Sequence, residues 1–100
     1  MLNNKSILVT GGTGSFGQKF IGTALNNYQP EKVIVYSRDE LKQFEMQKRW
    51  PEDSSVPIRY FIGDVRDLSR LKMAMANVEI VIHTAALNRF PQQNTTLLKP

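Results

Sequence analysis

The glycines of residues 10–17, which read TGGTGSFG, are the part of the chain best suited to bind a ligand. Gly11, Gly14 and Gly17 have the spacing G-x-x-G-x-x-G, and an overlapping G-x-G-x-x-G begins at Gly12. We expect the first glycines to adopt positive φ angles in a tight turn and Gly14 to let a pyrophosphate approach the backbone. Gly17 would let the following helix pack closely on a sheet, and the anion would rest on that helix's N-terminus.

A glycine-rich turn can also serve only to connect two elements. This one follows an apolar run at residues 6–10 and precedes helical apolar spacing from Phe16 to Tyr28, which is the context that a dinucleotide-binding turn requires. No Gly-Lys-Ser or Gly-Lys-Thr follows the glycines, so a nucleoside-triphosphate loop is not indicated. We therefore interpret the segment as a dinucleotide-binding turn.

The segment YSRD, residues 36–39, indicates which nicotinamide cofactor would bind. NAD sites usually place an acidic residue at the end of the second strand, whereas NADP sites place an arginine for the additional phosphate. Here Ser37 and Arg38 come first, and Lys42 lies one helical turn beyond Arg38, which favours NADP. The alternative is that Arg38 is a solvated loop residue and Asp39 only a helix cap.

Two aspartates follow the third apolar run, in the segment GDVRD at residues 63–67. Asp64 could accept a hydrogen bond from an adenine amino group while Val65 packs on the ring, or either Asp64 or Asp67 could cap the next helix. We assign binding to Asp64 and capping to Asp67.

The fourth apolar run ends in HTAAL, residues 83–87. The small residues of this segment would let a cofactor lie against the backbone. The only histidine of the chain, His83, is interpreted as a packed, hydrogen-bonded strand residue rather than a catalyst.

These segments require elements to position them, and the apolar pattern predicts those elements. Strands are expected at residues 6–10, 32–36, 59–62 and 79–83, separated by helices that end near Asn27, Arg49 and Asn77. Strands that are apolar throughout and alternate with helices form a parallel sheet covered on both faces. The predicted fold class is therefore α/β, a Rossmann-like parallel sheet truncated after about four strands in the order 3-2-1-4.

Composition excludes several classes of function. The 100 residues include no cysteine and one histidine, which excludes a disulfide framework and thiol chemistry and leaves little for a zinc site. No apolar stretch approaches the roughly 20 residues that span a bilayer, and the start lacks a secretory apolar region, so we expect a cytoplasmic chain without a membrane partner. The net charge of +4 is dispersed, with no basic run longer than Lys48-Arg49, which argues against nucleic acid.

Four segments, TGGTGSFG, YSRDELKQFEM, RYFIGDVRD and HTAAL, together resemble the extended short-chain dehydrogenase/reductase family. Within that family they are most similar to the UDP-N-acetylglucosamine 4,6-dehydratases that invert carbon 5, which belong to surface glycan and pseudaminic acid synthesis. The resemblance covers roughly residues 5–87. It implies a lyase in which bound NADP oxidises carbon 4 of a nucleotide sugar, water leaves across carbons 5 and 6, and hydride returns to carbon 6.

The resemblance and the spacing of Lys42 together define a set of candidate cofactor-binding residues. From the pyrophosphate through the 2'-phosphate and adenine to the nicotinamide side, they are Gly11, Thr13, Gly14, Ser15, Phe16, Gly17, Ser37, Arg38, Lys42, Asp64, Val65, Ala85 and Ala86. No catalytic and no metal-binding residue is assigned.

The family's Tyr-x-x-x-Lys pair has no counterpart near the predicted crevice. The only such pair in the chain, Tyr28 and Lys32, is interrupted by Pro30 and falls on the opposite side of the sheet, so we interpret it as chance. We therefore expect the N-terminal portion of a dehydratase that does not catalyse alone. A noncatalytic NADP sensor with the same fold and a nonfunctional fragment are the alternatives.

After Leu87 the sequence departs from the family, and only Pro91 still matches. This divides the chain into an NADP-binding half-domain at residues 1–87 and a divergent tail at residues 88–100, disordered or altered. The fourth strand would then present an open apolar edge, which predicts self-association.

Overall fold

The computed structural model describes residues 1–53, 55–84 and 96–98. Its elements in chain order are β1 (Ser6–Thr10), α1 (Ser15–Asn27), β2 (Lys32–Ser37), α2 (Glu40–Arg49), β3 (Ile58–Ile62), α3 (Leu68–Ala74), β4 (Ile80–His83) and β5 (Thr96–Leu98). The predicted alternation of strands and helices is confirmed, with strand bounds that differ by one residue at most. Within the described residues, every helix falls short of the length and hydropathy that crossing a membrane requires.

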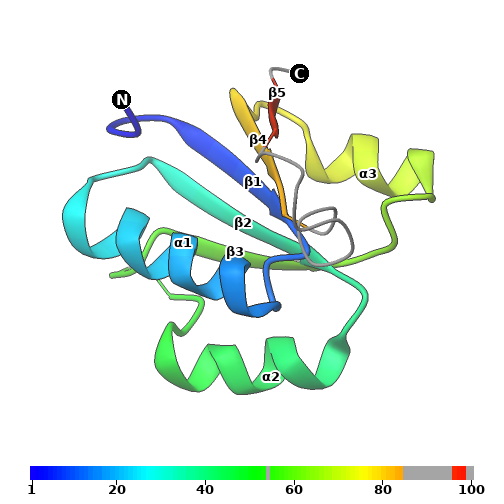
Figure 1. Ribbon diagram of the computed structural model, residues 1–100, viewed down its shortest axis with the longest axis horizontal. Coiled ribbons are helices and arrows are strands. Elements are labelled where there is room, and N and C mark those ends of the chain that lie inside the picture. Colours follow the sequence, from blue (N-terminus) through cyan, green and yellow to red (C-terminus); the bar gives the residue numbers. More distant parts are fainter. Residues whose placement is uncertain (54, 85–95, 99–100) are drawn as a thin grey trace.

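The strands form one sheet in the order β3-β2-β1-β4-β5 (Figure 1). β1 is parallel to both β2 and β4, and β2 is parallel to β3, which confirms the predicted order 3-2-1-4. Because β1 is internal, its carboxyl end opens between the ends of its two neighbours, where ligands bind in sheets of this kind.

Helices cover both faces of the sheet, as predicted. Figure 1 shows α1 and α2 on one face and α3 on the other. Successive residues of a strand point to opposite faces, so Ile7 and Val9 pack in the cluster that contains Ile21 of α1, whereas Leu8 packs with Ala74 of α3. This two-sided burial is the reason that the strands are apolar throughout rather than alternating.

The expected open edge at the fourth strand is wrong. β5 pairs antiparallel with β4, with Leu98 opposite Val81 and Thr96 opposite His83. The reasoning failed because it relied on the departure from the family after Leu87, although residues 95–98 (TTLL) include the β-branched and apolar types found in strands. The premise for self-association through this edge is therefore removed.

Both predicted aspartate caps are present. The side chain of Asp39 accepts a hydrogen bond from Lys42 N at 3.0 Å, at the start of α2. Asp67 accepts one from Arg70 N at 3.1 Å, at the start of α3. Asn77 has a φ of 63°, in the left-handed region that asparagine tolerates, and thus ends the turn after α3 as expected.

Candidate nucleotide-binding site

The glycine turn connects β1 to α1 and needs glycine at Gly11 and Gly12 for different reasons. Gly11 has a φ of 66°, which L side chains rarely adopt, and its N–H donates to Tyr36 O of the neighbouring strand at 3.0 Å. A Cβ on Gly12 would lie 2.9 Å from Val35 Cγ1. The expectation of positive φ is therefore confirmed at Gly11 only, whereas Gly12 is required for space.

Gly17 lets α1 begin directly against the turn. A Cβ at this position would lie 2.6 Å from Gly12 Cα and 2.7 Å from Gly11 O. These contacts are with backbone atoms, which cannot rotate away. Gly17 was expected to let the helix pack closely on the sheet. Its close contacts are instead with the backbone of the glycine turn, at Gly11 and Gly12.

Gly14 is the N-cap residue of α1 and provides no side chain to cap it. Its backbone is extended, with φ −74° and ψ 172°, and its N–H donates to Gly11 O at 3.0 Å. The first N–H groups of an α-helix have no partner within the helix. An uncapped start of this kind leaves them available to an anion, together with the positive end of the helix dipole.

A cleft of about 650 Å³ lies at the carboxyl ends of β1, β2 and β3. Eight of the sequence-predicted residues line it: Gly11, Thr13, Gly14, Ser37, Arg38, Lys42, Asp64 and Val65. Three others from the glycine turn, Ser15, Phe16 and Gly17, are not among its lining residues. Ala85 and Ala86, predicted for the nicotinamide side, lie outside the described residues.

Sequence reasoning did not assign Tyr36, Gly63 or Arg66 to this site, although all three line the cleft. The Tyr36 hydroxyl donates to Asp64 O at 2.8 Å, and a Cβ on Gly63 would lie 2.5 Å from that hydroxyl. Tyr36 is fully buried, and burial is the main reason that its pKa is raised. A tyrosine at the end of an otherwise aliphatic strand, with a glycine after the next strand, was the available signal.

Asp64 is held by two arginines at the mouth of the cleft. It accepts hydrogen bonds from Arg66 Nη2 at 2.8 Å, Arg66 Nε at 3.1 Å and Arg66 N at 2.9 Å. It also accepts one from Arg38 Nη1 at 3.2 Å. The hydrogen bonds from Arg66, with the charges of both arginines, hold the pKa of Asp64 well below its usual range. An adenine amino group would have to replace one of these donors, so the adenine assignment of Asp64 stays a prediction.

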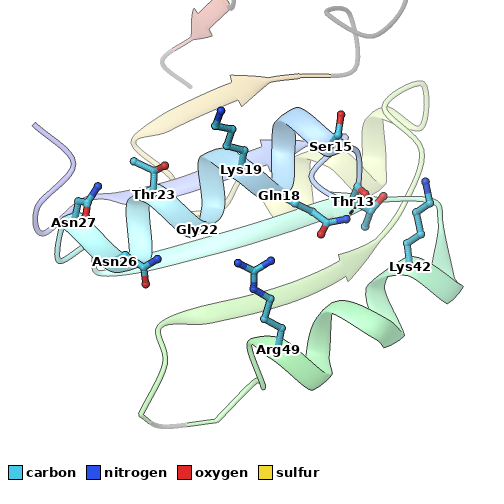
Figure 2. A pocket seen from close by; sticks show the side chains of 10 residues that line it. All are labelled: Thr13, Ser15, Gln18, Lys19, Gly22, Thr23, Asn26, Asn27, Lys42 and Arg49. Carbon is cyan, nitrogen blue, oxygen red and sulfur yellow. Dashed lines mark hydrogen bonds between the residues drawn. The ribbon is translucent and has the colours of Figure 1, made fainter.

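A polar groove of about 680 Å³ between α1 and α2 adjoins the cleft (Figure 2). It shares Thr13 and Lys42 with the cleft, and its described lining includes Lys19 and Arg49 but no carboxylate. Figure 2 labels both shared residues, and the Thr13 carbonyl accepts from Gln18 Nε2 at 2.8 Å. Ser15 lines this groove rather than the cleft. The groove is therefore positively charged along its described lining, and Lys42 carries that charge to the junction with the cleft, where it favours an anion.

His83 and Thr84 tie the end of β4 to the end of β1. Thr10 Oγ1 lies 2.5 Å from His83 Nδ1, as expected of a packed strand histidine. Thr84 is fully buried, and its single hydroxyl hydrogen is shared between Thr10 O at 2.5 Å and Gly11 O at 3.0 Å. These bonds hold the start of the glycine turn against the sheet.

The chain is similar to known proteins over most of its length. A family profile described as Polysaccharide biosynthesis protein matches residues 7–99, further than the motifs at residues 5–87 had suggested. The inverting UDP-N-acetylglucosamine 4,6-dehydratases of two Campylobacter jejuni strains are 56% and 55% identical over 91 residues. That alignment covers 91% of this chain but 26% of either relative, so the chain spans about a quarter of their length.

A solved structure has the same fold. The X-ray structure of Pen from Bacillus thuringiensis superposes with a TM-score of 0.77 and 36% sequence identity, over 85% of this chain and 25% of that one.

Proposed function

Because the chain belongs to the polysaccharide biosynthesis protein family, we propose that it forms the NADP-binding part of a nucleotide-sugar 4,6-dehydratase acting on UDP-N-acetylglucosamine. The observation that carries this proposal is the cleft at the carboxyl ends of β1, β2 and β3. There, an uncapped helix N-terminus and a group of basic side chains lie on adjoining walls. The similarity to the inverting dehydratases, rather than the cleft, extends the proposal to surface glycan synthesis with pseudaminic acid as the pathway product.

The glycine turn fits the pyrophosphate. Gly11 and Gly17 allow backbone geometry that any side chain would disturb, and Gly14 leaves the first N–H groups of α1 uncapped. Thr13 lies in the same turn and lines the cleft, while Ser15 and Phe16 follow in the first turn of α1. These residues would hold the bridging phosphates through backbone donors.

The end of β2 fits a 2'-phosphate better than a free ribose diol. Arg38 and Lys42 provide positive charge, and Ser37 provides a hydroxyl. An NAD site would need a carboxylate free to accept two ribose hydroxyls. Asp39, the acidic residue nearest this position, uses one carboxylate oxygen, Oδ1, to cap α2 through Lys42 N, which limits its capacity to accept both hydroxyls. The side chains at this strand end therefore support NADP as the cofactor.

The adenine and nicotinamide assignments complete the proposed site. Val65 is 36% exposed on the cleft wall and would pack on the adenine ring, with Asp64 beside it. Ala85 and Ala86 would face the nicotinamide side.

The role of this chain is to bind and orient. NADP supplies a hydride acceptor when bound, and the cleft residues would fix its orientation through the phosphates and the adenine. No acid or base is assigned at this mouth. Tyr28 is the C-cap residue of α1 and Lys32 begins β2, so that pair lies at the amino ends of the strands, away from the cleft. We infer that the chain binds cofactor without catalysing dehydration by itself.

Calorimetric titration of the purified chain with NADP and NAD tests the proposal. We expect NADP to bind with a dissociation constant at least tenfold lower than that of NAD, because a charge-assisted contact contributes about 1.5 to 3 kcal/mol. A second titration with UDP-N-acetylglucosamine tests whether substrate binding needs segments that the longer relatives have. Failure to bind either nicotinamide cofactor would refute the proposed function.

A further inference from the structure

A buried glutamine lies behind the cleft, where packing alone would be satisfied by an apolar residue. Gln43 of α2 is 2% exposed. Its Nε2 lies 3.2 Å from Ser37 O, 3.3 Å from Ser37 Oγ and 3.2 Å from Phe61 O. Two of these partners are carbonyl oxygens, which only accept, so the amide nitrogen must face them. The side chain thus joins α2 to the ends of β2 and β3.

Burying a polar side chain at this position costs free energy, and the packing of the core alone gives no reason for it. Burying an amide is unfavourable unless it is hydrogen-bonded, and Met46, one turn later on the same helix, fills its place in the core without polar atoms. The presence of an amide at Gln43 is therefore best explained by the group that it holds in place. The fixed group is Ser37, which is 7% exposed and lines the nucleotide cleft.

The hydrogen bonds around Ser37 determine what its hydroxyl can offer a ligand. Its oxygen accepts from Asp39 N at 3.1 Å and from Gln43 Nε2 at 3.3 Å, and it lies 3.3 Å from Thr13 Oγ1. The first two partners can only donate, and together they fill the two lone pairs of the hydroxyl oxygen. The hydrogen of Ser37 is therefore left to donate, either to Thr13 Oγ1 or to a ligand. A phosphate oxygen only accepts and carries charge, so it is the stronger acceptor of the two.

We propose that Gln43 is a positioning residue that sets the preference for NADP over NAD. It saturates the oxygen of Ser37 with donors and thereby commits the hydroxyl to donate toward a 2'-phosphate. The inference rests on the proposed function, because it names what determines the cofactor choice of that same site. Gln43 itself does not line the cleft, so its effect must pass through Ser37.

The test compares Gln43→Met with wild type in calorimetric titrations of NADP and NAD. Methionine keeps the length of the side chain and removes the amide. We expect the dissociation constant of NADP to rise about tenfold, the loss of one hydrogen bond to a charged group, with less than about a threefold change for NAD. Gln47→Met makes the same replacement at an exposed position of α2 and is the matched control. It should change neither dissociation constant.

A double-mutant cycle with Ser37→Ala shows whether the effect passes through the hydroxyl. In the Ser37→Ala background, Gln43→Met should change the NADP constant less than about twofold, because coupled residues are not additive. Additive losses, or equal losses for both cofactors, would overturn the inference while leaving NADP binding by wild type intact. If wild type binds neither cofactor, the proposed function fails and the inference with it.

If Gln43→Met does not fold, as judged by its thermal melt, the inference is tested by titrating Ser37→Ala with NADP and NAD. It keeps the amide and its carbonyl contacts, so the chain should still melt cooperatively and lose NADP selectively. An unchanged ratio of the NADP and NAD constants in this variant would overturn the inference.

Discussion

Arg38→Ala is the most direct test of the cofactor choice. The contacts of Arg38 allow the expected loss of NADP affinity to be estimated. The Arg38 side chain is 72% exposed and pairs with Asp64 at 3.2 Å. A charge-assisted contact with a phosphate contributes about 1.5 to 3 kcal/mol. To form it, Arg38 must give up at least part of an exposed ion pair, which contributes little by itself. We therefore expect the lower end of that range, about a tenfold rise in the NADP dissociation constant.

The same variant should leave NAD binding and folding nearly unchanged. NAD lacks the 2'-phosphate, and Arg66 still neutralises Asp64 through its side chain and backbone. The assay is calorimetric titration of both cofactors with a thermal melt of each protein, and Lys72→Ala on the exposed surface of α3 serves as the control for net charge. Equal losses for NADP and NAD would refute the assignment of Arg38.

Three further predictions concern stability. Gly17→Ala should lower the free energy of unfolding by about 1 to 3 kcal/mol, because its Cβ would lie 2.6 Å from Gly12 Cα; an unchanged melting temperature would contradict this. Gly22→Ala in the same helix should instead raise the free energy of unfolding by up to about 1 kcal/mol, since its Cβ would meet Trp50 Cζ2 at an ordinary 3.5 Å. Denaturant unfolding measures the change in both variants. Burial raises the pKa of Tyr60 to about 12 from 10.0, so between these values the folded state holds the proton that the unfolded state has lost. Stability should fall as pH rises through this window, and thermal melts of Tyr60→Phe should show a smaller fall, because the raised pKa of Tyr36 still contributes.

The sequence predicted the parts of the site that local rules determine. Gly11 adopts a positive φ, Asp39 and Asp67 cap helices, and Arg38 lies at the end of β2 in the lining of the cleft. Each of these roles follows from residue type and position along the chain. The order of the four parallel strands also followed, because right-handed crossovers leave few arrangements of this pattern.

What the sequence did not predict depends on contacts between distant segments. The carboxylate of Asp64 is engaged by Arg38, from another strand end, and this pairing cannot be seen in the motif GDVRD alone. Gln43 looks like an ordinary polar residue of an amphipathic helix until its burial is known. β5 was missed because pairing with β4 depends on where the chain returns in space, which a departure from a family pattern does not reveal.

The net charge of the whole cleft lining extends the argument for a phosphate over a free ribose diol. The lining includes two acidic residues, Asp39 and Asp64, and three basic ones. Asp64 is paired with Arg38 and Arg66, and Asp39 uses Oδ1 to cap α2. The lining therefore has one more positive than negative charge, and Lys42 is outside the ion pairs of the described residues. A dianion gains from this excess positive charge and from the hydroxyl of Ser37, whereas a diol finds only the second oxygen of Asp39 among the acceptors of these two carboxylates.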